Sequence, residues 1–472
     1  MLGKMKDKRK FFKDKKITQM GLGLLGRGVG DAAFLAKHGA DLLVTDIKNE
    51  KDLISSFKKL KKYRGIKFVL GEHRLEDFRN RDFILKAAGV PLDSPYIAEG
   101  KKNKIPIEMD ASLFFKLMPK GVTFIGVTGT RGKTTTVYLI YEILKRFLEV
   151  RPQTKRGLTS LRPKVFLAGN IKDTATLPLL EKVRLGDFVV LELDSWQLQG
   201  FGDAKISPHI AVFTTFLDDH LIYYKGDRKQ YFTDKANIFK YQKKGGVLVM
   251  GDDVVKVAHH LGAELPSGAR IAKAIDLPKN WKLKILGEHN RANVACALAT
   301  ARALKIPDEI SRKVFKNFGG VPGRLEFLRE IRGVKIYNDT CATTPDATVA
   351  ALQALSSKCQ VPSSKQIPNY KFQKEKKIVL ILGGSDKGLD MTNLVAQIPK
   401  YCKSILLLPG SGSEKLKVES LKVKNLKEAV KKAVAVAKKG DIILFSPAFA
   451  SFGLFKNEYD RGEQFVKLVK EL

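Results

Sequence analysis

Residues 126–136 read Gly-Val-Thr-Gly-Thr-Arg-Gly-Lys-Thr-Thr-Thr. An apolar run at 122–127 precedes this glycine-rich turn, and a helical pattern at 135–147 follows it. A strand, a glycine turn and a helix N-terminus together direct backbone N–H groups at an anion. In such a loop Lys133 would reach the terminal phosphates, and the Thr134 hydroxyl would bind Mg²⁺. The stretch predicts a nucleotide-binding α/β domain, the alternative being a glycine turn with a surface lysine.

The length of 472 residues predicts two to four domains, and 44% hydrophobic residues can fill several cores. No apolar run approaches the length of a membrane span. The basic segment 1–16 has no apolar stretch after it, so we expect a solvated tail and not a secretory signal. The cysteines are widely spaced, which favours a reducing cytoplasm over a disulfide framework. They are Cys296, Cys341, Cys359 and Cys402.

A formal net charge of +36 makes the chain strongly basic. Nucleic-acid binding, attraction of a polyanionic substrate and a lysine-rich surface without a specific role would each account for it. The lysines are spread along the whole chain, and arginines are not interleaved with aromatic residues. Nucleic-acid binding is therefore the least favoured of the three.

The N-terminal region reads as a strand at 17–20, a glycine turn at 21–28, a helix through Ala40 and a strand at 41–46. The turn has the spacing G-x-G-x-x-G, and the second strand ends in Asp46. This pattern is typical of a Rossmann half, which binds a nucleotide-type ligand. By itself the fingerprint is also compatible with a plain tight turn.

Polar residues follow the apolar strands expected in the middle of the chain, at 165–168, 188–193, 210–214 and 246–250. They are Asn170, Glu192, Asp219 and His220. The carboxyl ends of parallel strands are the usual place for a binding site, and Mg²⁺ prefers oxygen ligands. Glu192 has apolar neighbours, which makes it costly unless it meets a cation or hydrogen-bond donors. We predict a metal site there, against the alternative of an edge carboxylate that faces water.

A third βαβ pattern begins near Gly319. Its expected strands are 334–337, 378–382, 404–408 and 441–445, with a helix at 426–438. Residues 356–377 are polar and lysine-rich, and they predict a long loop or insertion.

These motifs resemble the Mur ligase family, ATP-dependent enzymes that form amide bonds in peptidoglycan synthesis. The resemblance covers nearly the whole chain. Its central part lies in the glycine-rich loop, Gly169-Asn170, Glu192, Asp219-His220 and Tyr231-Phe-Thr-Asp-Lys235. Gly287-Glu-His-Asn290-Arg-Ala-Asn293 and Gly323-Arg324-Leu-Glu326 are similar to further family motifs.

The C-terminal motifs resemble those of the D-glutamate-adding branch of the family. They are Asn338-Asp339-Thr340-Cys341-Ala342-Thr343, Gly383-Gly384-Ser385-Asp386-Lys387 and the run from Ser446 through Ser451-Phe452 to Arg461-Gly462. The resemblance implies an ATP-dependent ligase that joins D-glutamate to UDP-N-acetylmuramoyl-L-alanine through an acyl phosphate. We also expect a monomer that is located in the cytoplasm.

The family fold implied by this resemblance is α/β with three domains. Residues 1–118 would form a Rossmann-like domain for the UDP end of the substrate. Residues 119–318 would form a parallel sheet that binds ATP, and 319–472 a second Rossmann-like domain for the amino acid.

The resemblance also implies roles for individual residues. ATP would be bound by Gly129, Thr130, Arg131, Gly132, Lys133, Thr134, Thr135, Asn293, Arg324 and Asp339. Two Mg²⁺ ions would be held by Thr134, Glu192, His220 and Lys235, and the catalytic set would be Lys133, His220, Lys235 and Arg324. Substrate would be bound by Gly23, Leu24, Leu25, Asp46, Asn170, Thr343, Lys387, Ser451 and Phe452. Carbamylation of Lys235 is implied as well, with a surface lysine as the alternative.

The chain departs from the family pattern at three places. Cys341 stands where the family has a lysine, Gly453 where it often has an aspartate, and Glu458 where it has an aromatic residue after Asn457. Arg324, Lys387 or Lys133 would have to supply the missing charge. Other Mur-type ligases, including those for L-glutamate or folate, remain alternatives. So do a degenerate ligase and a basic P-loop protein that binds nucleic acid without catalysis.

Overall fold

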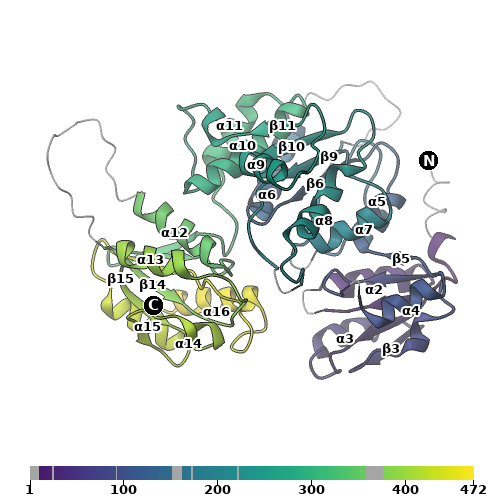
Figure 1. Ribbon diagram of the computed structural model, residues 1–472, viewed down its shortest axis with the longest axis horizontal. Helices are drawn as coiled ribbons and strands as arrows, with labels where there is room; N and C mark the ends of the chain where they lie inside the picture. The colour runs from purple at the N-terminus through teal and green to yellow at the C-terminus, as the bar shows by residue number, and fades with distance from the viewer. Residues whose placement is uncertain are drawn as a thin grey trace. The chain divides into compact units, whose positions relative to one another are not determined.

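The computed structural model describes residues 10–23, 26–91, 93–150, 162–171, 174–220, 223–357 and 376–472. Leu24, Leu25, Cys359 and most of the predicted insertion at 356–377 lie outside these ranges. The chain folds into two compact units, whose helices and strands are drawn in Figure 1. The first comprises Met1–Asp218, Tyr223–Asp276 and Asn293–Val314, and the second Asp219–Ile222, Leu277–Ala292 and Phe315–Leu472.

The first unit begins with a five-stranded parallel sheet of order β3-β2-β1-β4-β5 in the described residues. Its strands are β1 Lys16–Met20, β2 Asp41–Asp46, β3 Ile66–Leu70, β4 Phe83–Lys86 and β5 Ile107–Glu108. The helices that accompany it are α2 Arg27–Lys37, α3 Ile54–Leu60, α4 Pro95–Lys102 and α5 Asp110–Leu117. The predicted strand–turn–helix–strand at 17–46 is confirmed, except that the helix ends at Lys37.

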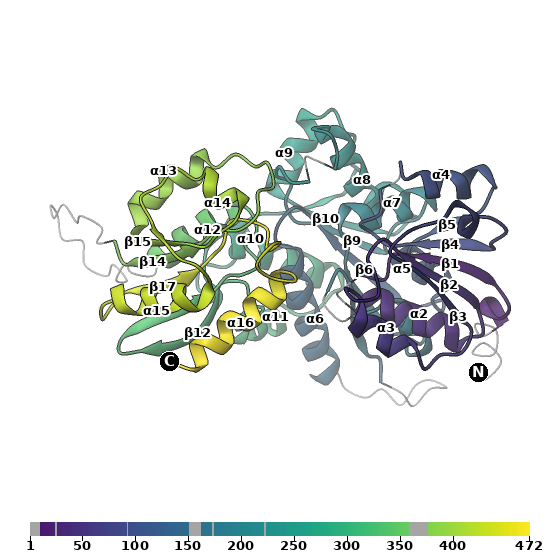
Figure 2. The same ribbon diagram turned by 90° about the horizontal axis from the view of Figure 1, so that it is seen from below.

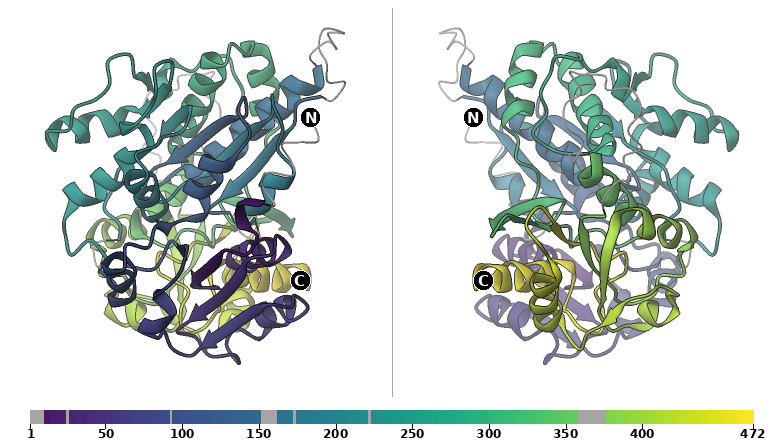
Figure 3. Two further views of the ribbon diagram at one scale, coloured as in Figure 1. Left: turned by 90° about the vertical axis from the view of Figure 1, so that its right-hand side faces the viewer. Right: turned by 90° about the vertical axis from the view of Figure 1, so that its left-hand side faces the viewer.

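The described residues also give the first unit a six-stranded parallel sheet of order β11-β10-β9-β6-β8-β7. Its strands are β6 Thr123–Thr128, β7 Val165–Gly169, β8 Phe188–Glu192, β9 Ile210–Phe213, β10 Val247–Gly251 and β11 Arg270–Ala272. Helices α6 Lys133–Val150, α7 Ser195–Asp203, α8 Arg228–Lys240 and α9 Asp252–His260 belong to it, and α10 Glu288–Ala303 and α11 Asp308–Asn317 follow. Figure 3 shows helices beside this sheet in two side views.

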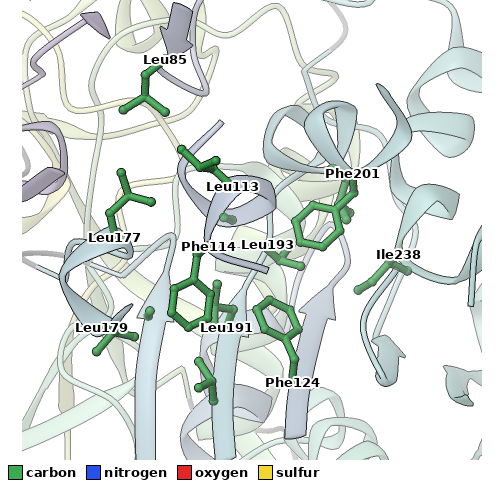
Figure 4. Close-up of a cluster of buried hydrophobic side chains, with 14 of the residues drawn as sticks. Leu85, Leu113, Phe114, Phe124, Leu177, Leu179, Leu191, Leu193, Phe201 and Ile238 are labelled. Carbon is green, nitrogen blue, oxygen red and sulfur yellow. The ribbon is translucent and has the colours of Figure 1, made fainter. Parts of the chain in front are cut away.

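Apolar side chains join both sheets of the first unit in one core. Figure 4 shows Phe114 of α5, Phe124 of β6 and Phe201 of α7 in this cluster. Each of the three is fully buried, and the ring of Phe124 lies 6.2 Å from that of Phe114 and 6.1 Å from that of Phe201. The continuous apolar sequence of these strands follows from their burial on both faces.

The second unit contains a six-stranded sheet of order β12-β13-β17-β14-β15-β16 in its described residues. Its strands are β12 Glu326–Ile331, β13 Val334–Asn338, β14 Ile378–Leu382, β15 Cys402–Leu407, β16 Leu421–Lys422 and β17 Ile442–Phe445. Its helices are α12 Pro345–Ser357, α13 Thr392–Tyr401, α14 Ser411–Lys415, α15 Leu426–Val436 and α16 Glu458–Lys470 (Figure 2). The sheet is parallel except for β12, which pairs antiparallel with β13.

Three parallel or mostly parallel sheets with helices bear out the predicted α/β class. The domain boundaries at 118 and 318 remain a prediction, because the first two sheets share a core. In the described part of the chain, no helix is long and apolar enough to cross a bilayer.

Candidate active site

The glycine-rich loop connects the carboxyl end of β6 to the N-terminus of α6. Gly129 and Gly132 have φ values of +150° and +83°, where side chains are strained. A Cβ atom would lie 2.1 Å from Thr214 Oγ1 at Gly129, and 2.1 Å from Asn293 Oδ1 at Gly132. Only glycine fits at these two positions. The loop thus leads into α6, whose first N–H groups have no partner within the helix and favour an anion.

Two threonines that follow β9, Thr214 and Thr215, make hydrogen bonds with the backbone of this loop. Thr215 accepts bonds from Thr130 N at its carbonyl oxygen and from Arg131 N at Oγ1, each at 2.8 Å. Thr214 Oγ1 donates to the Arg131 carbonyl oxygen at 2.5 Å. Because these bonds come from the neighbouring strand, they fix the loop before any ligand arrives.

Two lysine side chains converge on one backbone oxygen of the loop. The Nζ atoms of Lys133 and Lys235 each donate to the Gly129 carbonyl oxygen at 3.0 Å. Lys235 comes from α8 and is 1% exposed. Two ammonium groups on one acceptor concentrate positive charge at the loop, which favours an anionic ligand.

Glu192 ends β8, an interior strand beside β6, and is 2% exposed. It accepts a bond from Thr134 Oγ1 at 2.7 Å and from Asn170 Nδ2 at 3.4 Å. The alternative of an edge carboxylate that faces water is therefore wrong. A carboxylate and a hydroxyl at the start of the loop helix are oxygen donors that fit Mg²⁺.

A buried polar network positions the helix that carries Lys235. Asp234 accepts bonds from Gln199 Nε2 at 2.7 Å, Tyr224 Oη at 2.9 Å and Gln230 Nε2 at 2.7 Å. Burial raises the pKa of the Asp234 carboxyl. Tyr231, one helical turn before Lys235, lies 3.2 Å from Thr130 Oγ1 through its hydroxyl. Helix α8 is thus anchored both to α7 and to the glycine-rich loop.

A pocket of about 280 Å³ lies in the first unit, next to the glycine turn of the predicted N-terminal site. Gly23 and Asp46 line it. The Asp46 carboxylate accepts bonds from Leu22 N at 2.8 Å and Gly23 N at 3.2 Å. Asp46 therefore shapes the glycine turn as well as lining the pocket. Lys86 and Gln197, which the sequence did not single out, line it too.

In the second unit, Asp339 follows β13 and is 8% exposed. Its carboxylate accepts bonds from Ser446 Oγ at 2.8 Å and Leu325 N at 2.9 Å. Burial raises its pKa to about 7. Two loops therefore meet here, one after β13 and one after β17.

Burial raises the pKa of the Cys341 thiol, three residues beyond the end of β13, to about 11. The thiol is therefore neutral near pH 7. The charge of Arg324 acts on this thiol and opposes the shift. Arg324 therefore lies close enough to act on this position, and whether Arg324, Lys387 or Lys133 supplies the missing charge stays a prediction.

Comparisons with known proteins agree with this geometry. Residues 127–269 match the Mur ligase middle domain, and residues 323–449 match the Mur ligase, glutamate ligase domain. A UDP-N-acetylmuramoylalanine--D-glutamate ligase of Roseiflexus sp. (strain RS-1) is 33% identical, over 97% of this chain and 98% of the relative. One of the same name from Borreliella afzelii (strain PKo) is 32% identical, over 96% and 97%.

The chain belongs to the Mur ligase family.

Solved Mur ligase structures share its fold. UDP-N-acetylmuramate-alanine ligase MurC from Thermotoga maritima has a TM-score of 0.58 at 19% identity, covering 97% of this chain and 99% of that one. MurF ligase from Thermotoga maritima in complex with ADP has a TM-score of 0.57 at 19% identity, covering 91% and 95%. As a Mur ligase, the chain is an ATP-dependent, ADP-forming enzyme.

The first unit of this Mur ligase brings together one part of the predicted site, formed by Lys133, Thr134, Asn170, Glu192 and Lys235. The other predicted residues are placed as follows. Asn293 lies against Gly132, and Leu24 and Leu25 lie outside the described residues. His220, Arg324, Asp339, Thr343, Lys387, Ser451 and Phe452 belong to the second unit. The contacts of these seven residues with the ligands remain predictions. So does their position relative to the glycine-rich loop.

Within the second unit, Lys387 Nζ donates to Asp219 Oδ1 at 3.1 Å. His220 has a left-handed φ of 56°, and its Nε2 atom lies 3.9 Å from Asp219 Oδ2. Ser451 is 4% exposed, whereas Phe452 is 68% exposed. The Phe452 ring is thus open to solvent, whereas its carbonyl oxygen accepts a bond from Ser385 Oγ at 2.5 Å.

The buried lysine of the N-terminal pocket leads to a prediction about pH. Lys86 is 2% exposed, and its Nζ donates to the Val90 carbonyl oxygen at 2.6 Å. Burial lowers its pKa from 10.5 to about 8. As pH falls from 10.5 to 8, the unfolded chain takes up the proton first, so the charged lysine costs the folded state stability. The stability advantage of Lys86→Met over wild type, measured as free energy of unfolding, should therefore increase by about 1–3 kcal/mol as pH falls from 10.5 to 8.

Denaturant unfolding at pH 7.5 and pH 10.5 measures this difference. Lys102→Met, which alters an exposed lysine on α4 whose charge is not among those that act on Lys86, should show no such dependence. Equal stability differences for Lys86→Met at both pH values would contradict the prediction.

Proposed function

We propose that this Mur ligase joins D-glutamate to UDP-N-acetylmuramoyl-L-alanine, with cleavage of ATP to ADP and phosphate, in peptidoglycan precursor synthesis. The observation that carries the proposal is the glycine-rich loop with the buried Glu192–Thr134 pair at its helix. It occurs in a chain that aligns over nearly its full length with relatives named for this reaction. The net charge of +36 would also favour an anionic UDP-linked substrate.

ATP with Mg²⁺ supplies the phosphoryl group that turns the terminal carboxylate into an acyl phosphate, which the glutamate amine then attacks with release of phosphate. The chain contributes position and charge. Lys133 would release its bonds to Gly129 and Thr130 and donate to the phosphates. Thr134 and Glu192 would hold one Mg²⁺ ion. Arg324 and Asp339 would bind the nucleotide, and Thr343, Lys387 and Ser451 the glutamate carboxylates.

Carbamylation of Lys235 and a second Mg²⁺ ion with His220 are part of the proposal. A Lys235 ammonium on the same carbonyl oxygen as Lys133 is electrostatically unfavourable in a buried site. A carbamate would replace that positive charge by an anionic oxygen ligand. Carbon-13 NMR of the enzyme in ¹³C-bicarbonate should show one carbamate signal that Lys235→Arg lacks. An identical spectrum for the variant would exclude carbamylation.

The test of the function is phosphate release by the purified chain with ATP, Mg²⁺ and UDP-N-acetylmuramoyl-L-alanine. D-glutamate, L-glutamate, L-alanine and a diamino acid are supplied one at a time. Release with D-glutamate alone supports the proposal, whereas release with another amino acid reassigns the ligase within its family. A monomeric state and a location in the cytoplasm, where ATP is available, belong to the proposal; size-exclusion chromatography tests the first.

A further inference from the structure

Arg461 is the largest side chain that the structure buries completely. It lies in the first turn of α16, and its exposed fraction is 0%. Burial lowers the pKa of its guanidinium to about 10, so the group is still charged at neutral pH. A buried charge is costly unless hydrogen bonds compensate it. The position of those bonds indicates what the charge is used for.

The guanidinium spans two loops. Its Nη2 and Nε atoms donate to the Thr340 carbonyl oxygen at 2.8 Å and to Thr340 Oγ1 at 3.2 Å. Its Nη1 atom donates to the Phe449 carbonyl oxygen at 3.2 Å. Its direct partners are therefore neutral groups, two of them backbone oxygens. Thr340 belongs to the loop after β13, and Phe449 to the loop after β17.

The glycine next to Arg461 allows this close approach. A Cβ atom at Gly462 would lie 2.6 Å from Thr340 Cγ2. Thr340 Oγ1 in turn donates to the Glu458 carbonyl oxygen at 3.1 Å. Helix α16 therefore contacts the first loop directly, and a larger residue at 462 would displace it.

The two loops carry the residues proposed to bind glutamate. Thr343 follows Thr340 by three residues, and Ser451 follows Phe449 by two. A backbone bond also joins the loops, from Ala448 N to the Ala342 carbonyl oxygen at 2.9 Å. Asp339 has its own contacts with Ser446 and Leu325. Arg461 should therefore affect the distance between the proposed glutamate-binding residues more than it affects the position of Asp339, which is proposed to bind the nucleotide.

We infer that Arg461 is a positioning residue that sets the spacing of the loops 339–343 and 449–452, and thereby the affinity for the incoming amino acid. It contacts no substrate, because it is fully buried. The rigid fork of a guanidinium can reach both loops, whereas a lysine ammonium is a single point donor on a shorter reach. The inference rests on the proposed function, since it takes glutamate as the substrate of these loops.

The test compares Arg461→Lys, Thr340→Val and the double variant in steady-state kinetics, with Lys470→Ala on the same helix as the control. We expect the KM for glutamate to rise at least about tenfold in Arg461→Lys and less in Thr340→Val, with the KM for ATP within about twofold of wild type. The double variant should resemble Arg461→Lys, because both changes break the same contact. Lys470→Ala should match wild type.

An unchanged glutamate KM in Arg461→Lys, or equal rises in both KM values, would overturn the inference. If Arg461→Lys does not fold, Thr340→Val decides alone, and a wild-type glutamate KM there overturns it. A loss that is confined to thermal stability and active fraction would mean a purely structural role. Failure of the proposed function is distinguishable, because wild type itself would then release no phosphate with glutamate.

Discussion

Lys133→Ala should lower phosphate release by about 10³-fold or more, because the loop loses the cation that is proposed to stabilise charge on the transferred phosphoryl group. In the structure, Lys133 Nζ donates bonds to the Gly129 and Thr130 carbonyl oxygens, at 3.0 and 3.2 Å. The loop is held separately by Thr214 and Thr215. We therefore expect the melting temperature to change by no more than a few degrees. Phosphate release and thermal unfolding, measured on the same preparation, check both parts.

Lys145→Ala is the matched control, because this lysine lies on the same helix and is exposed. It should keep wild-type turnover. Wild-type turnover in Lys133→Ala, with Lys145→Ala also unaffected, would remove the glycine-rich loop from the proposed mechanism.

The central sheet could be predicted from the sequence because its strands are apolar runs bounded by turns. Strands β3, β5, β11, β12 and β16 have no comparable signal in the sequence and are not among those predicted. Strand β12, Glu326–Ile331, is an edge strand that mixes charged and apolar residues without regular alternation, and its antiparallel pairing depends on the turn that leads into β13. Local composition does not determine such a pairing.

The site shows the same division. Glu192, Lys133 and Thr134 were predicted because a motif places them at strand and helix ends. Lys86 and Arg461 were missed as structural features, because burial of a charged side chain follows from tertiary contacts and not from its neighbours in sequence. In the sequence, Arg461 stands out only as part of the C-terminal motif. The Thr214-Thr215 pair at the end of a predicted strand was the signal that could have identified the support of the loop.

Glu192→Gln should separate catalysis from stability. The amide keeps the shape of the side chain and can still accept the bond from Thr134 Oγ1, but it lacks the negative charge that Mg²⁺ requires. We expect turnover to fall by about 10²–10³-fold, and the Mg²⁺ concentration for half-maximal rate to rise roughly 10–100-fold. The free energy of unfolding should stay the same or increase, because a buried charge is replaced by a neutral group and the Asn170 amide can turn its oxygen toward the new NH₂ group. Turnover against Mg²⁺ concentration and denaturant unfolding measure the two effects.

Asp187→Asn is the matched control at the opposite end of the same strand. Asp187 is 4% exposed, and its carboxylate accepts bonds from Lys164 N at 2.7 Å and Arg184 N at 2.8 Å. An asparagine there would point an NH₂ group at one of these N–H donors, which should cost about 1–3 kcal/mol of stability. Its Mg²⁺ dependence should remain that of wild type, since the residue lies at the amino end of β8, away from the loop. If Glu192→Gln instead lost stability and kept its Mg²⁺ dependence, Glu192 would be a structural carboxylate like Asp187, and the metal would have to be held elsewhere.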